Sequence, residues 1–269
     1  GTHAFASYLR QIGHSFEVVN GHPHQPGAMS QLDLAVRLTT TRARLTHSKL
    51  GLVGTHAPGF LNMHVDPTMI QTQLGPMVHH FGVQELIDAV HAIDRDAVAE
   101  DRQSLDAMSW RKRDEIPDEA LIMTSRYTLA IRQMVDEQQL DAVAIRCWPE
   151  LPNVVGVWPY VAFARLGDEG LPLAMEGDLD GAITLLLGQC MGYGPGYLSD
   201  WLEHDEHTIT LWHQGEAPTG LCDPESLALA RHVNNEKPVV LESQLAPERD
   251  VTVARVWHYD GSYRMMAMD

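Results

Sequence analysis

The sequence predicts an α/β protein in which a Rossmann-like domain with a parallel sheet is followed by an antiparallel β domain of partial-barrel type. Two observations lead to this fold class. Between residues 141 and 175, an apolar strand, a helix and a second apolar strand follow one another, and such a crossover makes the two strands parallel. After residue 191, β-branched and aromatic residues alternate at period two, which is typical of antiparallel strands.

These patterns divide the chain into three expected domains. Residues 1–48 contain a helix, a short strand and, beyond a Pro/Gly/His loop, a second helix, and are interpreted as the remnant of a first α/β domain. Residues 49–195 form the α/β domain with the parallel sheet. Residues 196–269 form the antiparallel, barrel-like domain.

Apolar periodicity and capping residues locate the individual elements. Strands are expected at residues 16–19, 50–53, 141–145, 171–175, 208–212, 239–243, 251–257 and 263–268. Helices are expected at residues 2–12, 30–48, 67–74, 83–93, 97–108, 117–138, 159–166 and 179–191. A Gly/Pro loop at residues 54–60 follows one buried strand and would let backbone approach a ligand.

The charge balance excludes two classes of partner. The chain has 36 acidic and 19 basic residues, a net charge of −17, and no basic stripe. Nucleic acid and anionic membranes are therefore not expected partners. No apolar run approaches the ~20 residues of a membrane span, so a cytoplasmic protein is expected. Cys147, Cys190 and Cys222 are widely spaced and are interpreted as reduced packing thiols.

Two acids in the second half of the chain are the main candidates for chemistry. Glu176 follows the apolar strand at 171–175, and Asp200 follows a Gly-rich segment and a second predicted strand. A carboxylate at a strand end is delivered to the rim of a sheet, where α/β proteins bind ligands. Either acid could instead have a structural role, Glu176 as a helix-capping residue and Asp200 as a turn residue.

Neighbouring residues could complete a site made mainly of oxygen ligands, as hard metal ions prefer. Asp178 is a candidate for substrate contact, but its position just before a helix fits an N-cap better. His213 follows an apolar strand and could be a metal ligand, a proton relay or a core histidine.

Arg146 and Trp148 follow the predicted strand at 141–145, which is expected to lie beside the strand that ends at Glu176. An arginine beside an indole can hold the oxygens of a polyol while the ring stacks on its carbon face. The alternative is an ion pair between Arg146 and Glu150, with Trp148 in the core.

Four segments in this order and spacing resemble the L-fucose/L-arabinose isomerase family. They are Arg146-Cys147-Trp148-Pro149-Glu150, Met175-Glu176-Gly177-Asp178, Leu198-Ser199-Asp200 and Trp212-His213-Gln214-Gly215. The segment from Gly51 to Asp66 is similar to that family's middle domain.

The resemblance implies a metal-dependent aldose–ketose isomerase that uses Mn²⁺, or another divalent cation such as Mg²⁺ or Co²⁺. It implies two α/β domains and a β-barrel domain, assembled as a homo-oligomeric trimer or hexamer. Glu176 and Asp200 would bind the metal and move protons, and His213 is a further candidate ligand. The histidine that completes the family's metal site has no identified counterpart in this sequence.

Two alternatives to a sugar isomerase stay open. One is a sugar-binding or regulatory relative that has the pocket without turnover. The other is a different metal-dependent carbohydrate enzyme, such as an epimerase or an aldolase. All three would bind a small sugar, and they differ in whether a ketose, an epimer or two fragments are formed.

Overall fold

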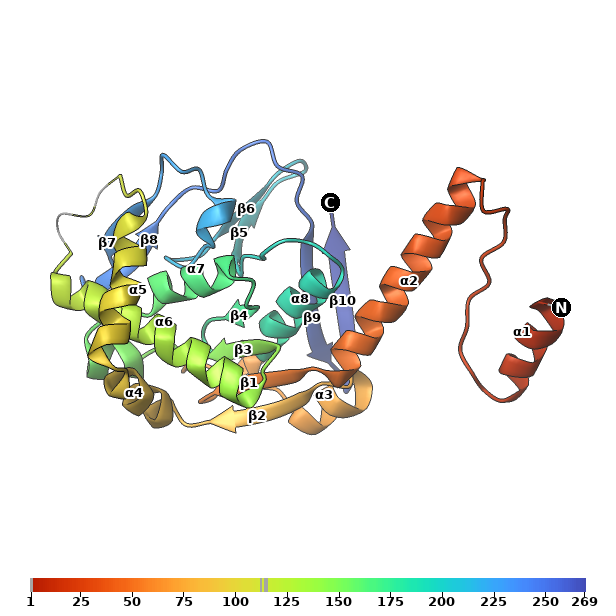
Figure 1. Ribbon diagram of the computed structural model, residues 1–269, viewed down its shortest axis with the longest axis horizontal. Coiled ribbons are helices and arrows are strands. Elements are labelled where there is room, and N and C mark those ends of the chain that lie inside the picture. The colour runs from red at the N-terminus through yellow and green to blue at the C-terminus, as the bar shows by residue number, and fades with distance from the viewer. Residues whose placement is uncertain (1, 112, 114–115) are drawn as a thin grey trace. The chain divides into compact units, whose positions relative to one another are not determined.

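The computed structural model describes residues 2–111, 113 and 116–269 of the chain. Contacts divide the chain into two units, residues 1–44 and residues 45–269. The larger unit contains a parallel sheet with helices on both faces, together with three antiparallel strand pairs (Figure 1). The predicted α/β class, with a parallel sheet followed by antiparallel strands, is confirmed.

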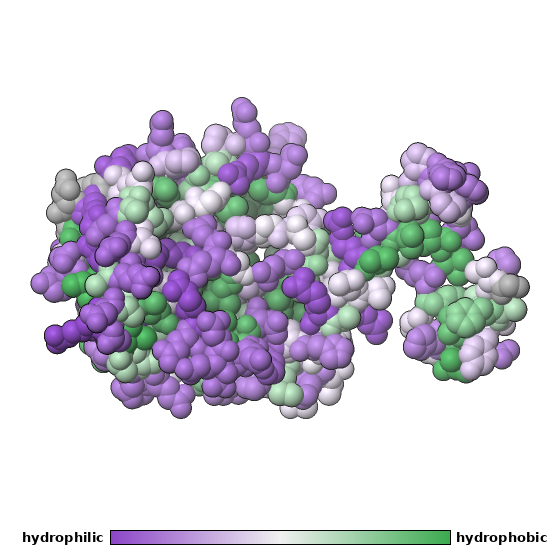
Figure 2. Space-filling view, viewed as in Figure 1, coloured by the Kyte–Doolittle hydropathy of each residue, from purple (hydrophilic) through white to green (hydrophobic). Residues whose placement is uncertain are grey.

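The N-terminal unit is helical. It consists of α1 (Thr2–Gln11) and most of α2 (Pro26–His47), and no residue of α1 is buried. Apolar side chains of α2, such as Leu34 and Val36, are exposed. Figure 2 shows green, hydrophobic surface on this unit. The predicted strand at residues 16–19 is wrong, because this segment has no regular structure and pairs with no neighbouring strand.

Four parallel strands form the central sheet in the order β2-β1-β3-β4. They are β1 (Lys49–Val53), β2 (Met77–Phe81), β3 (Ala142–Ile145) and β4 (Leu173–Ala174). β1 pairs with both β2 and β3, so the strand order reverses between β1 and β3. Open α/β sheets bind ligands at the carboxyl ends of the strands beside such a reversal.

Side chains alternate between the two faces of the sheet and form two cores. On one face, Val53, Val143 and Ile145 pack with helices α4 (Val83–Ala92), α6 (Asp118–Gln138) and α7 (Tyr160–Asp168). On the other face, Leu50 and Ala144 pack with α3 (Pro67–Gln73) and α8 (Leu179–Cys190). Both faces are covered, which explains why β1 and β3 read as continuous apolar runs.

Capping residues fix the starts of several helices. Asp66 accepts a hydrogen bond from the backbone N of Thr68 at the start of α3, and Asp94 does the same for α5 (Arg95–Ala107). α5 is joined to α7 by a buried ion pair, in which Arg165 contacts Asp101 at 2.7 and 2.9 Å. None of the helices in the described part of the chain is long and apolar enough to cross a membrane.

Three antiparallel pairs follow the sheet. β5 (Asp200–His204) pairs with β6 (Ile209–Trp212), β7 (Ala228–Arg231) with β8 (Pro238–Glu242), and β9 (Val253–Tyr259) with β10 (Ser262–Met268). The strands at 209–212, 238–242, 253–259 and 262–268 were predicted to within two or three residues. Asp200 begins β5, so its predicted position at the end of a strand is wrong.

Candidate functional site

Three loops meet at the carboxyl edge of the parallel sheet. Residues 54–60 follow β1, residues 146–150 follow β3, and residues 175–178 follow β4. Because β1, β3 and β4 are adjacent and parallel, their carboxyl ends share one edge. The candidate site is built on this edge.

A tight turn from Met175 to Asp178 holds Glu176 at the sheet edge. The backbone N of Asp178 donates to the carbonyl of Met175 at 3.0 Å, and the two central residues both have positive φ, 59° at Glu176 and 70° at Gly177. Positive φ at both central positions is the geometry of a type I′ turn. A non-glycine residue in this conformation costs roughly 1–3 kcal/mol and persists only where its surroundings fix it.

The surroundings of this turn are tight. A Cβ atom on Gly177 would lie 2.2 Å from the carbonyl oxygen of Thr55, so only glycine fits. The backbone N of Ala57 donates to the carbonyl of Glu176 at 2.8 Å, and the backbone N of Gly177 donates to Ile145 at 3.0 Å. The loop after β1 and the end of β3 therefore hold the turn from both sides.

The Glu176 carboxylate is half-buried and accepts a hydrogen bond from an indole. Trp148 Nε1 donates to Glu176 Oε1 at 2.9 Å, and the Trp148 ring lies edge-to-face against Phe60 at 6.0 Å. Burial raises the pKa of Glu176, and the negative charges of Asp200 and Asp178 raise it further, whereas the Trp148 hydrogen bond and His213 lower it. A raised pKa makes the ionised carboxylate a stronger base than an ordinary carboxylate.

Asp200 and His213 come from the first antiparallel pair. Asp200 is exposed and pairs with Trp212, the last residue of β6. His213 directly follows Trp212. The hydroxyl of Tyr197 fixes the His213 backbone, donating to its carbonyl and accepting from its N, both at 2.8 Å. The charges of Asp200 and His213 both act on Glu176, so the structure brings each of these two predicted residues within electrostatic range of Glu176.

Arg146 and Trp148 lie on the loop after β3 but have different partners. Arg146 makes a two-pronged ion pair with Glu150, at 2.9 and 2.5 Å, and donates to Thr55 Oγ1 at 3.3 Å. The ion pair between Arg146 and Glu150 that the sequence analysis gave as an alternative is thus present, whereas Trp148 contacts Glu176. Their assignment to substrate binding stays a prediction.

Asp178 is buried and fully engaged within the chain. It caps α8 by accepting from the backbone N of Gly181 at 2.9 Å, and it pairs with Arg255 of β9 at 2.5 and 2.9 Å. The capping role expected from its place in the sequence is observed. Its assignment as a substrate-binding residue stays a prediction.

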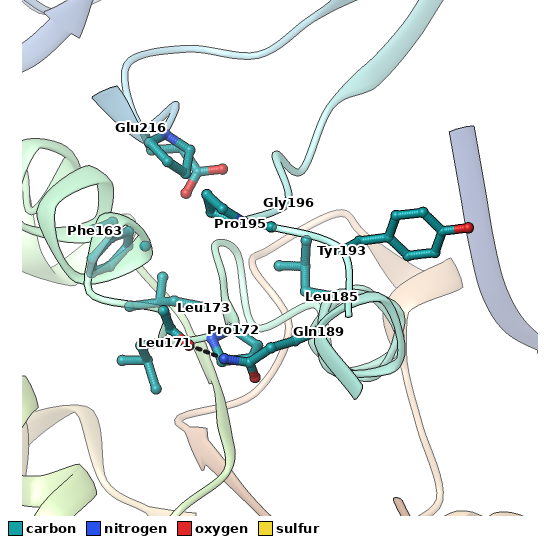
Figure 3. A pocket seen from close by; sticks show the side chains of 14 residues that line it. Phe163, Leu171, Pro172, Leu173, Leu185, Gln189, Tyr193, Pro195, Gly196 and Glu216 are labelled. Atoms are coloured by element: carbon teal, nitrogen blue, oxygen red, sulfur yellow. Dashed lines mark hydrogen bonds between the residues drawn. The ribbon is translucent and has the colours of Figure 1, made fainter. Parts of the chain in front are cut away.

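Glu216 is a functional candidate that the sequence interpretation missed. It is only 5% exposed and lines a cavity of about 160 Å³, whose walls include Phe163, Leu185 and Pro195. Figure 3 shows its carboxyl turned toward Pro195 and Gly196. Within the described ranges, no hydrogen bond or ion pair reaches this carboxyl. Burial, together with the charge of Glu176, raises the pKa of Glu216 well above its usual range.

One pattern in the sequence could have indicated Glu216. It stands between Gly215 and Ala217-Pro218, three residues after His213, in a segment without other charges. An acid in a short uncharged segment between strands is a candidate for burial. Arg255 had no such signal, because its partner Asp178 lies 77 positions away.

The donor chemistry of the site fits a divalent cation in part. Glu176 and Asp200 supply carboxylate oxygens, and His213 Nδ1 is buried with no hydrogen-bond partner among the described residues. Carboxylate oxygens and an imidazole nitrogen are ligands that Mn²⁺ and similar ions accept. In the part of the chain that the structure describes, however, no three His, Cys, Asp or Glu side chains are already assembled into a metal site.

Comparison with known proteins shows similarity to sugar isomerases. Residues 64–194 match the L-arabinose isomerase central domain. Sulfoquinovose isomerase from Priestia aryabhattai is 25% identical over 273 residues, which cover 100% of this chain and 60% of that protein. L-Arabinose isomerase from Arthrobacter sp. (strain FB24) is 26% identical over 212 residues, which cover 77% of this chain and 41% of that protein.

The chain resembles the arabinose/fucose isomerase family, with a central-domain match over residues 64–194 and relatives named as isomerases. A third relative, sulfoquinovose isomerase from Alkalicoccus urumqiensis, is 24% identical over 274 residues. The chain spans about 60% of the length of the sulfoquinovose isomerases it matches. The residues matched to the family's central domain include Trp148 and the turn that carries Glu176.

Replacing Gly177 by alanine should destabilise the protein by roughly 2–4 kcal/mol, because a side chain at positive φ is strained and its Cβ would overlap the Thr55 carbonyl. Urea unfolding measures the loss. Gly188→Ala is the matched control, since Gly188 lies in α8 with no atom within 4 Å of a new Cβ, and this change should be neutral or stabilising by up to ~1 kcal/mol. Equal effects of the two substitutions would contradict the assigned geometry.

Glu216→Gln should make the protein more stable at pH 7, and the gain should vanish below about pH 4. The pKa of Glu216 is raised in the folded state, so this carboxyl ionises at lower pH in the unfolded chain than in the folded protein. The free energy of unfolding of the wild type therefore falls as the pH rises from the ordinary pKa of a glutamate to the raised pKa of Glu216. The amide is neutral at every pH and escapes this loss. Urea unfolding across a pH series measures the effect, with exposed Glu206→Gln as control. A pH-independent difference between Glu216→Gln and wild type would refute it.

Proposed function

We propose that this protein interconverts an aldose and its ketose, with Glu176 and Asp200 as the acid/base pair and as ligands of a divalent cation. The observation that carries the proposal is the Glu176 carboxyl. It is held at a sheet edge by a constrained turn, accepts a hydrogen bond from Trp148, and has a raised pKa. Perturbed acids in such positions are typical of functional sites.

The family relationship supports this reaction class. Matched relatives are named sulfoquinovose isomerase and L-arabinose isomerase, and the match to the first covers the whole of this chain. We therefore infer an aldose as the substrate class. An anionic sugar such as sulfoquinovose and a neutral pentose such as L-arabinose are the two substrates to compare.

The reaction requires a proton to move between adjacent carbons. A carboxylate removes the proton from C2 of the aldose and returns it to C1, while the hydroxyl proton on O2 passes to O1. We assign the carbon proton to Glu176, because burial raises its pKa and so makes its carboxylate a stronger base than an ordinary one. Asp200, exposed at the start of β5, is the partner for the hydroxyl proton.

A divalent ion bound by Glu176 and Asp200, with His213 as a third candidate ligand, would supply positive charge to the substrate's first two oxygens. The unpartnered Nδ1 of His213 is consistent with such a role. Trp148 orients the Glu176 carboxylate and excludes water from one side of it.

Glu176→Gln should lower the rate of ketose formation by at least about 100-fold while leaving the fold intact, because the amide cannot accept a proton. Mn²⁺-loaded protein is mixed with sulfoquinovose, L-arabinose and L-fucose, and ketose is measured. Glu203→Gln is the control, since Glu203 is an exposed acid on the same strand as Asp200.

Near-normal turnover by Glu176→Gln would reject the assigned role. If the wild-type protein bound these sugars without forming ketose, the isomerase proposal would fail in favour of a sugar-binding relative. Exchange of solvent deuterium into C1 or C2 separates isomerisation from cleavage, which yields two fragments.

Trp148→Phe should move the acid limb of the kcat/KM profile to higher pH. The indole N–H stabilises the Glu176 carboxylate, so its loss raises the pKa of Glu176 further and activity falls earlier as the pH is lowered. Trp110→Phe serves as the control, because the indole N–H of Trp110 donates to the carbonyl of Leu105 in α5 and not to Glu176. An acid limb that stayed in place or moved to lower pH in Trp148→Phe would contradict this account.

A further inference from the structure

The β9–β10 hairpin lies beside α8 (Figure 1), and polar side chains join the two. Arg255 of β9 contacts Asp178 at 2.5 and 2.9 Å. Further along α8, the backbone N of Val256 donates to Thr184 Oγ1 at 2.9 Å. These contacts bring a segment near residue 255 against the helix that directly follows the Glu176 turn.

Asp178 is the point where this attachment meets the turn. It is 2% exposed, and its two oxygens are shared between the backbone N of Gly181 and the Arg255 guanidinium. Asp178 also closes the turn itself, because its backbone N donates to the carbonyl of Met175. Asp178 thus belongs both to the turn, through its backbone, and to the contact with Arg255, through its side chain, and only two peptide units separate it from Glu176.

Burial of the Asp178 carboxylate favours the ion pair between Arg255 and Asp178. A carboxylate that is almost fully buried loses several kcal/mol of hydration, and its cationic partner must compensate for that loss. The guanidinium fork also fixes the direction of the Asp178 carboxylate, because two parallel N–H groups contact its two oxygens. Glu176 is in a strained backbone conformation that depends on such fixed neighbours.

We propose that Arg255 is a positioning residue for Glu176, acting through Asp178 to hold the Met175–Asp178 turn in the geometry that presents the Glu176 carboxylate. This inference rests on the proposed function for its catalytic meaning, but its structural content is independent of turnover. It assigns to the hairpin a role in the site, besides its packing on α8.

The same hairpin provides matched comparison variants. Tyr263 Oη and His258 Nδ1 contact Asp180, at 3.1 and 3.0 Å, and Asp180 is 1% exposed. These contacts attach the same hairpin to the same helix, but their carboxylate neither caps α8 nor closes the turn. A general loosening of the hairpin should affect both groups of variants alike, whereas positioning of Glu176 should depend on Arg255.

The indole N–H of Trp148 reports the position of the Glu176 carboxylate directly, because the two are hydrogen-bonded at 2.9 Å. Its ¹H–¹⁵N resonance is measured in metal-free, full-chain protein and assigned with Trp148→Phe. Arg255→Gln and Asp178→Asn should both move it upfield as the hydrogen bond weakens; asparagine still caps the helix, so only the ion pair is lost. Arg255→Lys should give a smaller shift. Tyr263→Phe and His258→Gln should leave the resonance at the wild-type position.

Mn²⁺ titration adds a second readout, with an expected loss of affinity of about tenfold for Arg255→Gln, as for outer-shell partners of metal ligands. An unchanged Trp148 resonance in both Arg255→Gln and Asp178→Asn would overturn the proposal, as would equal shifts in all the hairpin variants. If Arg255→Gln does not fold, Arg255→Lys and Asp178→Asn decide. A shifted resonance together with full turnover by Glu176→Gln would retain the positioning role and reject the proposed function.

Discussion

The left-handed backbone at Glu176 and Gly177 is the constraint on which the candidate site depends. Two consecutive residues at positive φ turn the chain sharply between β4 and α8 and leave the Glu176 side chain at the sheet edge. The close approach of the Thr55 carbonyl excludes any side chain at Gly177. Strain at Glu176 is offset by hydrogen bonds to two other segments, the loop after β1 and the end of β3, so the position of the carboxylate depends on contacts from outside the turn.

A second feature of the site is the concentration of acids with little compensating charge. Glu176, Asp200 and Glu216 interact electrostatically, while Arg146 is paired with Glu150. Burial and mutual repulsion raise the pKa values of Glu176 and Glu216, which weakens the folded state at neutral pH. Proteins keep such arrangements where they have a use, and a cation or a transferred proton would relieve the repulsion. The repulsion between these acids therefore both lowers the stability of the folded protein and favours the proposed binding of a cation or a proton.

Strands were predicted correctly from the sequence where both faces of the segment are buried or where its apolar periodicity is strong. β1 and β3 read as apolar runs because helices cover them on both sides, and the strands at the end of the chain alternate clearly. β2 (Met77–Phe81) was missed, because an edge strand with two histidines lacks that apolar continuity. The segment at 16–19 has strand-like residues, but a strand also requires a pairing partner, which local sequence cannot reveal.

The sequence by itself determined the fold class, the placement of Glu176 after an apolar strand, and the capping role of Asp178, because these depend on local pattern and capping chemistry. Only the tertiary structure decided which distant groups meet. Trp148 reaches Glu176 across 28 positions and Arg255 reaches Asp178 across 77. Burial decides the ionisation of Glu216, and burial is a sum over residues from many segments, so it is fixed only when the chain has folded.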